Sequence, residues 1–167
     1  MKRSRPLLLY VLAALSAVYI FFNIYQEMVY LTEKEYFTGT AYFEKQAETM
    51  SELDPEDSDD QITLERKELE IQMRTIDNEN YTRNHTTFLF IYTVGLIALI
   101  LMYLLNIKGL GLYVFYVLME ISNRYFIYSE IEGFISNYVV LNLILSLAFI
   151  GGYYSIFYKL KKQNSNA

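Results

Sequence analysis

Four long apolar stretches separated by polar segments dominate the chain and decide its fold class. They cover residues 7–25, 88–105, 110–128 and 138–158, and each is close to twenty residues long with few charges. An α-helix of that length crosses the roughly 30 Å hydrocarbon core of a bilayer at about 1.5 Å per residue. Because lipid cannot hydrogen-bond an exposed backbone, a crossing segment of this kind must be helical. The pattern predicts an all-α integral membrane protein, a four-transmembrane-helix bundle that forms one domain over residues 1–167.

The polar segment 26–87 between the first two stretches predicts an antiparallel helical hairpin outside the bilayer. Its first half carries an aromatic stripe, although Gly39 weakens the prediction of a helix there. An acidic stretch with Pro55, at residues 51–61, separates the two halves. In its second half, apolar residues recur at the spacings of one helical face, at Ile62, Leu69, Met73 and Ile76. We expect the hairpin stripe to pack internally, and this segment is also where a protein partner would dock.

The acidic stretch invites comparison with a calcium loop. Its carboxylates are Asp54, Glu56, Asp57, Asp59 and Asp60. They lack the spacing, the central Gly and the terminal Glu of an EF-hand. A solvated turn between two helices is therefore the favoured interpretation, and neither a metal nor a cofactor is expected.

The distribution of basic residues predicts how the chain is threaded. Basic residues precede the first stretch and follow the fourth, and Lys108 lies in the tight turn between the second and third. These three segments contain no acidic residue. Segment 26–87 instead holds sixteen acidic and six basic residues, a net charge of −10. Since basic residues favour the cytoplasmic side, both termini are predicted to be cytoplasmic and the hairpin extracytoplasmic. The first stretch could alternatively be a cleaved signal peptide. Its apolar run is longer than the hydrophobic region of a usual signal peptide, which favours an uncleaved anchor.

Composition narrows the classes of function. The chain has no Cys and a single His, at residue 85, and its formal net charge is −5. These facts disfavour thiol redox chemistry, zinc sites and nucleic-acid binding, and no set of residues typical of an active site is evident. The prediction is a protein that is not an enzyme. His85 lies at the predicted membrane boundary and is interpreted as an interfacial polar residue.

Charged residues within the third stretch are the main candidates for function. Glu120 lies about 16 Å along a helix that starts at Gly109, and Arg124 follows at i+4 on the same face. Because each charge at the bilayer centre costs about 3 kcal/mol, such residues are expected to face the bundle interior and to pair. Counting rise from the cytoplasmic ends brings polar residues of the other stretches to similar depths. The predicted buried polar cluster is Glu120, Arg124, Asn123, Ser122, Asn142, Ser146, Asn23, Ser16 and Thr93.

Two short motifs carry a resemblance to a known group. Residues 5–12, RPLLLYVL, and the turn at residues 106–113, NIKGLGLY, resemble small four-span proteins of Bacteroidota along most of the chain. The Gly-Leu-Gly form of the turn departs from the Lys-Gly-Phe-Tyr style of that group. The resemblance implies a bacterial inner (plasma) membrane and carries over no catalytic residue.

Two functional hypotheses remain open. The first is a non-catalytic membrane protein that contacts the bilayer and a protein partner through the acidic hairpin, as an accessory or assembly subunit. The second is a small transporter or channel that forms a homo-oligomer and uses Glu120 as a proton or cation site. A structural ion pair is the simplest interpretation of Glu120 and Arg124, since polar side chains hold membrane helices together.

Overall fold

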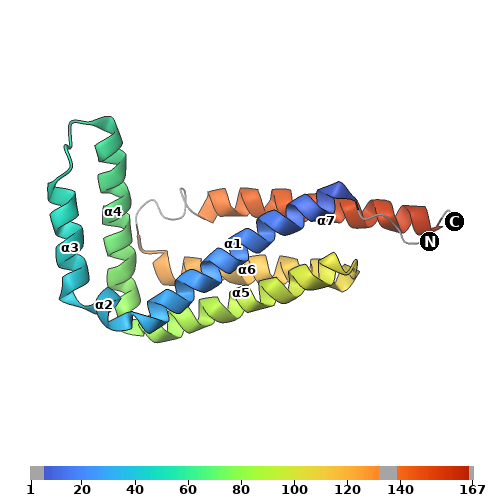
Figure 1. The fold of residues 1–167 in the computed structure, drawn as a ribbon, viewed down its shortest axis with the longest axis horizontal. Coiled ribbons are helices and arrows are strands. Elements are labelled where there is room, and N and C mark those ends of the chain that lie inside the picture. Colours follow the sequence, from blue (N-terminus) through green and yellow to red (C-terminus); the bar gives the residue numbers. More distant parts are fainter. Residues whose placement is uncertain (1–5, 132–138, 166–167) are drawn as a thin grey trace.

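The computed structural model describes residues 6–131 and 139–165, and every regular element within them is a helix. Four long helices lie alongside one another, and a helical pair runs across them at one end (Figure 1). The long helices are α1 (Leu7–Thr32), α5 (Tyr81–Tyr103), α6 (Ile107–Tyr128) and α7 (Val140–Ser165). The pair is formed by α3 (Thr40–Ser51) and α4 (Ser58–Asp77), with the short α2 (Lys34–Thr38) before it and the 3₁₀ turn η1 (Asn78–Asn80) after it.

Three of the helical stretches are long and apolar enough to cross a membrane. They are Leu7–Thr32, the continuous stretch Ser58–Tyr103 whose apolar part is α5, and Val140–Lys162. Because every regular element of the described residues is a helix, the prediction of an all-α fold is confirmed for them. Helix α6 covers the predicted third span but does not belong to these three, because Glu120, Arg124 and its other polar residues lower its hydropathy. Residue 138, the predicted start of the fourth span, lies outside the described residues.

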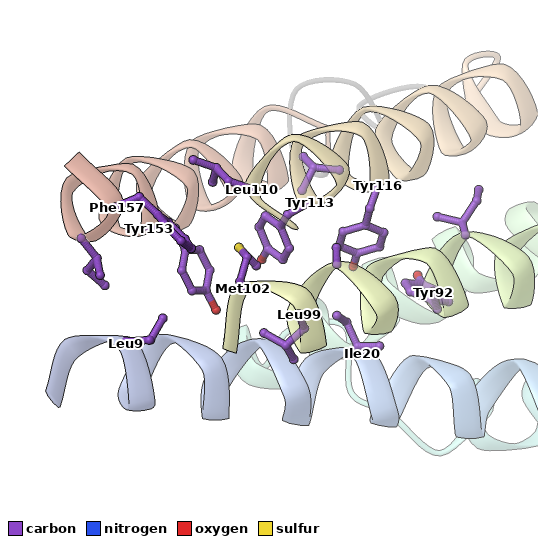
Figure 2. Close-up of a cluster of buried hydrophobic side chains, with 14 of the residues drawn as sticks. Leu9, Ile20, Tyr92, Leu99, Met102, Leu110, Tyr113, Tyr116, Tyr153 and Phe157 are labelled. Carbon is purple, nitrogen blue, oxygen red and sulfur yellow. The ribbon is translucent and has the colours of Figure 1, made fainter. Parts of the chain in front are cut away.

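The core of the bundle is built from aromatic and aliphatic side chains of all four long helices. Figure 2 shows side chains from each helix turned toward the same interior: Leu9, Ile20, Tyr92, Leu99, Met102, Leu110, Tyr113, Tyr116, Tyr153 and Phe157. The outer face is also apolar, with Val18 70% and Phe126 81% exposed. An apolar outer surface of this extent suits lipid and would be unfavourable in water.

A tight turn brings α6 back along α5. Leu105 adopts a positive φ of 59°, and the backbone N–H of Asn106 donates to the carbonyl of Leu101 at 2.9 Å, which ends α5. The Asn106 side chain then caps α6 by accepting from the N–H of Lys108 at 3.0 Å. A Cβ on Gly109 would stand 2.6 Å from the backbone nitrogen of Met102. Only glycine therefore allows this close approach of the two helices.

Helices α3 and α4 contact each other through polar as well as apolar side chains. Tyr42, only 2% exposed, donates its hydroxyl to Oε1 of Glu70 at 2.6 Å, and Lys67 Nζ donates to Gln46 at 2.8 Å. Burial and the Glu70 carboxylate raise the pKa of Tyr42 well above its ordinary value of 10.0. The sequence did not single out Tyr42. Its ring lies against the aromatic members of the predicted stripe, Tyr36, Phe37 and Phe43.

The acidic turn between α3 and α4 is organised by its own carboxylates. Asp57 is the N-cap of α4 and accepts from the N–H of Asp59 at 2.8 Å, while Asp54 accepts from the N–H of Glu56 at 2.9 Å. Within residues 6–131 and 139–165, no group of three or more His, Cys, Asp or Glu side chains is placed to hold a metal ion. Asp57 thus caps α4, and Asp54 and Asp60 accept backbone hydrogen bonds within the turn.

Candidate functional site

Glu120 and Arg124 lie one turn apart on α6, and their contacts reach α1 and α5. Glu120 is 8% exposed, and its Oε1 accepts hydrogen bonds from the hydroxyls of Tyr19 at 2.6 Å and of Tyr92 at 3.1 Å. Nη2 of Arg124 donates to the same Tyr92 hydroxyl at 2.6 Å, and Nε of Arg124 lies 3.6 Å from Oε1 of Glu120. The carboxylate is thus held by one guanidinium and two phenols from three different helices.

Other residues of the predicted cluster lie inside the bundle at two depths. Asn23 is buried close to the ion pair and donates from Nδ2 to the backbone oxygen of Tyr19 at 2.8 Å. Ser16 lies deeper, with its Oγ 3.3 Å from the Tyr113 hydroxyl and 3.1 Å from the Tyr153 hydroxyl. A cavity of about 140 Å³ separates α7 from α1 and α6 here, and its polar lining is Ser16, Tyr19, Tyr113, Tyr116, Asn142 and Ser146.

Two residues of the predicted cluster face away from the bundle interior. Ser122 and Thr93 are exposed, and the Thr93 hydroxyl donates to the backbone oxygen of Leu89 in its own helix at 2.8 Å. Asn123, by contrast, is half-buried, and its Nδ2 is shielded from solvent. The prediction was wrong for Ser122 and Thr93 because a count of helical rise gives the depth of a residue but not the face on which it lies. Tyr92, next to Thr93, takes the inward position instead.

A second buried network, which sequence reasoning missed, joins α4 to the bundle. His85 of α5 is 3% exposed, and its Nδ1 lies 2.6 Å from Oε2 of Glu27 on α1. Its Nε2 lies 3.1 Å from Oδ2 of Asp77 at the end of α4, in an ionic contact rather than a well-directed hydrogen bond. Asp77 also accepts from Asn84 Nδ2 at 2.6 Å and from the Tyr128 hydroxyl at 3.2 Å. One imidazole therefore bridges two carboxylates on different helices, and its position at a membrane boundary stays a prediction.

Arg74 lies one turn before Asp77 on the same helix and faces the same junction. Its side chain is 7% exposed, and the guanidinium carbon stands 3.9 Å from the ring centre of Tyr30 and 5.1 Å from that of Phe37. Tyr81 completes this aromatic wall by donating its hydroxyl to the backbone oxygen of Tyr30 at 3.0 Å. The cation is thus stabilised by aromatic faces, to which guanidinium groups are attracted.

The network shifts the titration of its members in opposite directions. Asp77 and His85 both precede the apolar part of α5, which begins at Phe88. Burial alone would raise the pKa of the Asp77 carboxyl. The contacts with His85 and Asn84 lower it by more than burial raises it, so the pKa falls below its ordinary value of 3.8. Burial lowers the pKa of His85, but Asp77 and Glu27 outweigh it, so that the pKa rises above 6.5. Both shifts favour the charged forms that attract each other.

A cavity of about 250 Å³ lies at this junction, between α4 and the ends of α1, α5 and α6. Its charged lining comprises the acids Glu27, Glu70 and Asp77 and the bases Arg66, Arg74, His85 and Arg124. Arg124 therefore borders this cavity while it also pairs with Glu120. The two polar clusters form one continuous region from the bundle interior to the base of the α3–α4 pair.

One sequence signal for the missed network existed in the spacing of three residues. Asp77, Asn84 and His85 are separated by seven and eight positions, which places them on one face of a nearly continuous helix. The position of Glu27, just past the first apolar stretch, puts a carboxylate at the same membrane boundary. Nothing in the sequence, however, shows that α1 and α5 pack with these faces together.

Comparison with protein families, with curated proteins and with solved structures finds no match to this chain.

Proposed function

We propose that this chain is a non-catalytic, four-span protein of a bacterial inner membrane, with both termini cytoplasmic, that presents the α3–α4 pair to a protein partner. Helix α6 serves as the remaining span, since its 22 residues reach about 33 Å at 1.5 Å per residue. Its central charges turn toward α1 and α5, where Tyr19 and Tyr92 bind Glu120. Paired, inward-facing charges are what a spanning helix with ionisable residues requires.

The contact of His85 with Glu27 and Asp77 is the observation that carries this proposal. It fixes the end of α4 to α1 and α5 through charged groups that are each less than one-tenth exposed. A segment that served only as a linker would not need such an attachment. The network supports a function in which the orientation of the α3–α4 pair relative to the membrane matters.

The exposed surface of the α3–α4 pair suits a partner with a basic face. Glu44 and Glu48 of α3 and Glu65 and Glu68 of α4 are exposed, and Ile62 is 52% exposed beside them. Complementary charge speeds association and excludes partners of the wrong sign. We therefore expect the partner to contribute Lys and Arg side chains to the contact.

Photocrosslinking in native membranes tests this function. A photoreactive residue at position 48 or 65 should give one defined adduct, which weakens at high salt. The same residue at Thr82, exposed but on α5, provides the control. With the photoreactive residue at position 48, replacement of Glu44, Glu65 and Glu68 by Gln should abolish the adduct while the circular dichroism of the purified protein is unchanged. An adduct that survives this replacement contradicts the proposal.

The alternative is the homo-oligomeric transporter or channel that uses Glu120. The cavity beside Tyr19 favours it, because Tyr19 joins that cavity to the Glu120 carboxylate. The occupation of Glu120 Oε1 by Tyr19, Tyr92 and Arg124 speaks against it, since an ion or a proton would have to displace these partners. Proton or cation uptake into proteoliposomes that is lost in Glu120→Gln would establish the alternative.

A further inference from the structure

The cavity at the base of α4 is rich in hydrogen-bond donors. Three guanidinium groups line it, from Arg66 and Arg74 on α4 and from Arg124 on α6, together with the imidazole of His85. Guanidinium groups present a planar fork of N–H donors that matches carboxylate and phosphate oxygens. Their convergence from two helices on about 250 Å³ of space suggests a site for an anion.

The carboxylates that line the same cavity already have partners. Glu27 and Asp77 both contact His85, at 2.6 and 3.1 Å. Glu70 accepts the hydroxyl of Tyr42 at 2.6 Å. The negative charges of the lining are thus engaged with other side chains.

Arg74 is the most deeply buried of these arginines. Within the described residues, no carboxylate oxygen comes within the 4.0 Å that defines an ion pair with its nitrogens. Its neighbours are the rings of Tyr30 and Phe37 and the hydroxyl groups of Tyr30 and Tyr42, with Asp77 farther away. A charge that is 93% buried is costly unless an opposite charge lies beside it. An anion in the cavity would provide that charge.

We infer that this cavity binds a single phosphate group, held by the buried Arg74, the exposed Arg66 and Arg124 of α6. Its volume lies below the roughly 300–1,000 Å³ of pockets that enclose drug-sized molecules, so it fits a phosphate headgroup rather than a whole amphiphile. The phosphate belongs either to a lipid or to a free ion. The site goes beyond the docking function proposed above, and only the lipid source depends on the proposed membrane placement, which puts the cavity at headgroup level.

Binding is tested with the full chain in a phosphate-free, uncharged detergent. One probe is inorganic phosphate at constant ionic strength, followed by the shift of the thermal unfolding midpoint. The other is phosphatidylglycerol, followed by its retention in native mass spectrometry, with an uncharged glycolipid as reference. Wild-type protein should bind at least one phosphate probe and not retain the glycolipid.

Matched arginine variants separate the site from general charge effects. Arg66→Gln alters the exposed rim and should weaken phosphate binding about tenfold, the effect of one charge-assisted hydrogen bond. Arg83→Gln removes an exposed arginine that does not line the cavity and should leave binding within about twofold. Arg74→Lys keeps the charge but loses the fork, and should weaken binding as well. If Arg74→Lys fails to fold, the Arg66 and Arg83 pair decides alone.

The outcomes distinguish the two sources and the failure of the inference. Retention of phosphatidylglycerol without a response to inorganic phosphate identifies a lipid headgroup, and a response to both identifies phosphate itself as sufficient. Binding of neither probe by wild-type protein, or equal losses in Arg66→Gln and Arg83→Gln, would overturn the inference and leave Arg74 as part of an internal network only. None of these results depends on whether a protein partner docks on α3 and α4.

Discussion

Replacement of His85 by Ala should weaken the attachment of α4 to the bundle and lower the free energy of unfolding. The change removes the contacts of one imidazole with Glu27 at 2.6 Å and with Asp77 at 3.1 Å, and it leaves two carboxylates that are at most 7% exposed without their cation. Removal of one partner from a buried ion pair costs about 3–5 kcal/mol. We expect the lower end, about 3 kcal/mol or roughly a hundredfold in the unfolding equilibrium, because Asn84 and Tyr128 still bind Asp77.

The measurement is denaturant unfolding in mixed micelles at pH 6, followed by far-ultraviolet circular dichroism. Thr86→Ala, an exposed change on the same helix, should alter the free energy of unfolding by less than about 0.5 kcal/mol. A double-mutant cycle of His85→Ala with Glu27→Gln should give a coupling energy of about 1–3 kcal/mol, since the two residues are in direct contact. If His85→Ala costs no more than Thr86→Ala, or if the coupling is zero, the network does not hold α4 to the bundle.

Three further predictions concern pH, the α5–α6 turn and the acidic turn. Because the pKa of His85 is raised on folding, protonated His85 stabilises the folded protein fully below its unfolded-state pKa. This stabilisation is lost as pH rises through the folded-state pKa. The difference in unfolding free energy between wild type and His85→Ala should therefore shrink in a titration above neutral pH. Gly109→Ala places a Cβ 2.6 Å from the Met102 backbone nitrogen and should cost about 2 kcal/mol or more in the same unfolding assay, whereas Gly111→Ala, with open space around it, should be neutral or stabilising. Asp57→Ala removes the N-cap of α4 and should cost about 1 kcal/mol, seen as faster amide hydrogen exchange in the first turn of α4.

The helices could be predicted from the sequence because their signals are local. An apolar run near twenty residues leaves no structural choice in lipid, and the i+4 spacing of Glu120 and Arg124 already places them on one face. Helix α6 shows the limit of this reasoning, since Glu120 and Arg124 lower its hydropathy below that of the other three. Its membrane crossing therefore stays a prediction.

The faces of the helices, and the network at His85, could not be predicted in the same way. Thr93 and Tyr92 lie at neighbouring depths, but packing turns Tyr92 inward and leaves Thr93 exposed. The contact of His85 with Glu27 joins residues 58 positions apart. Such a contact depends on how α1 rotates against α5, which is set by the whole aromatic core and not by either segment alone.

The central claim is that the chain crosses the membrane four times with the α3–α4 pair outside. The chain has no Cys, so single cysteines report topology without background labelling. Cysteine at position 51, 108, 129 or 161 is to be exposed in intact cells to a maleimide that does not cross membranes. The account predicts labelling at 51 and 129, with 108 and 161 labelled only after the cells are opened. Equal labelling of 108 and 129 in intact cells would show that α6 does not span, and would contradict the account.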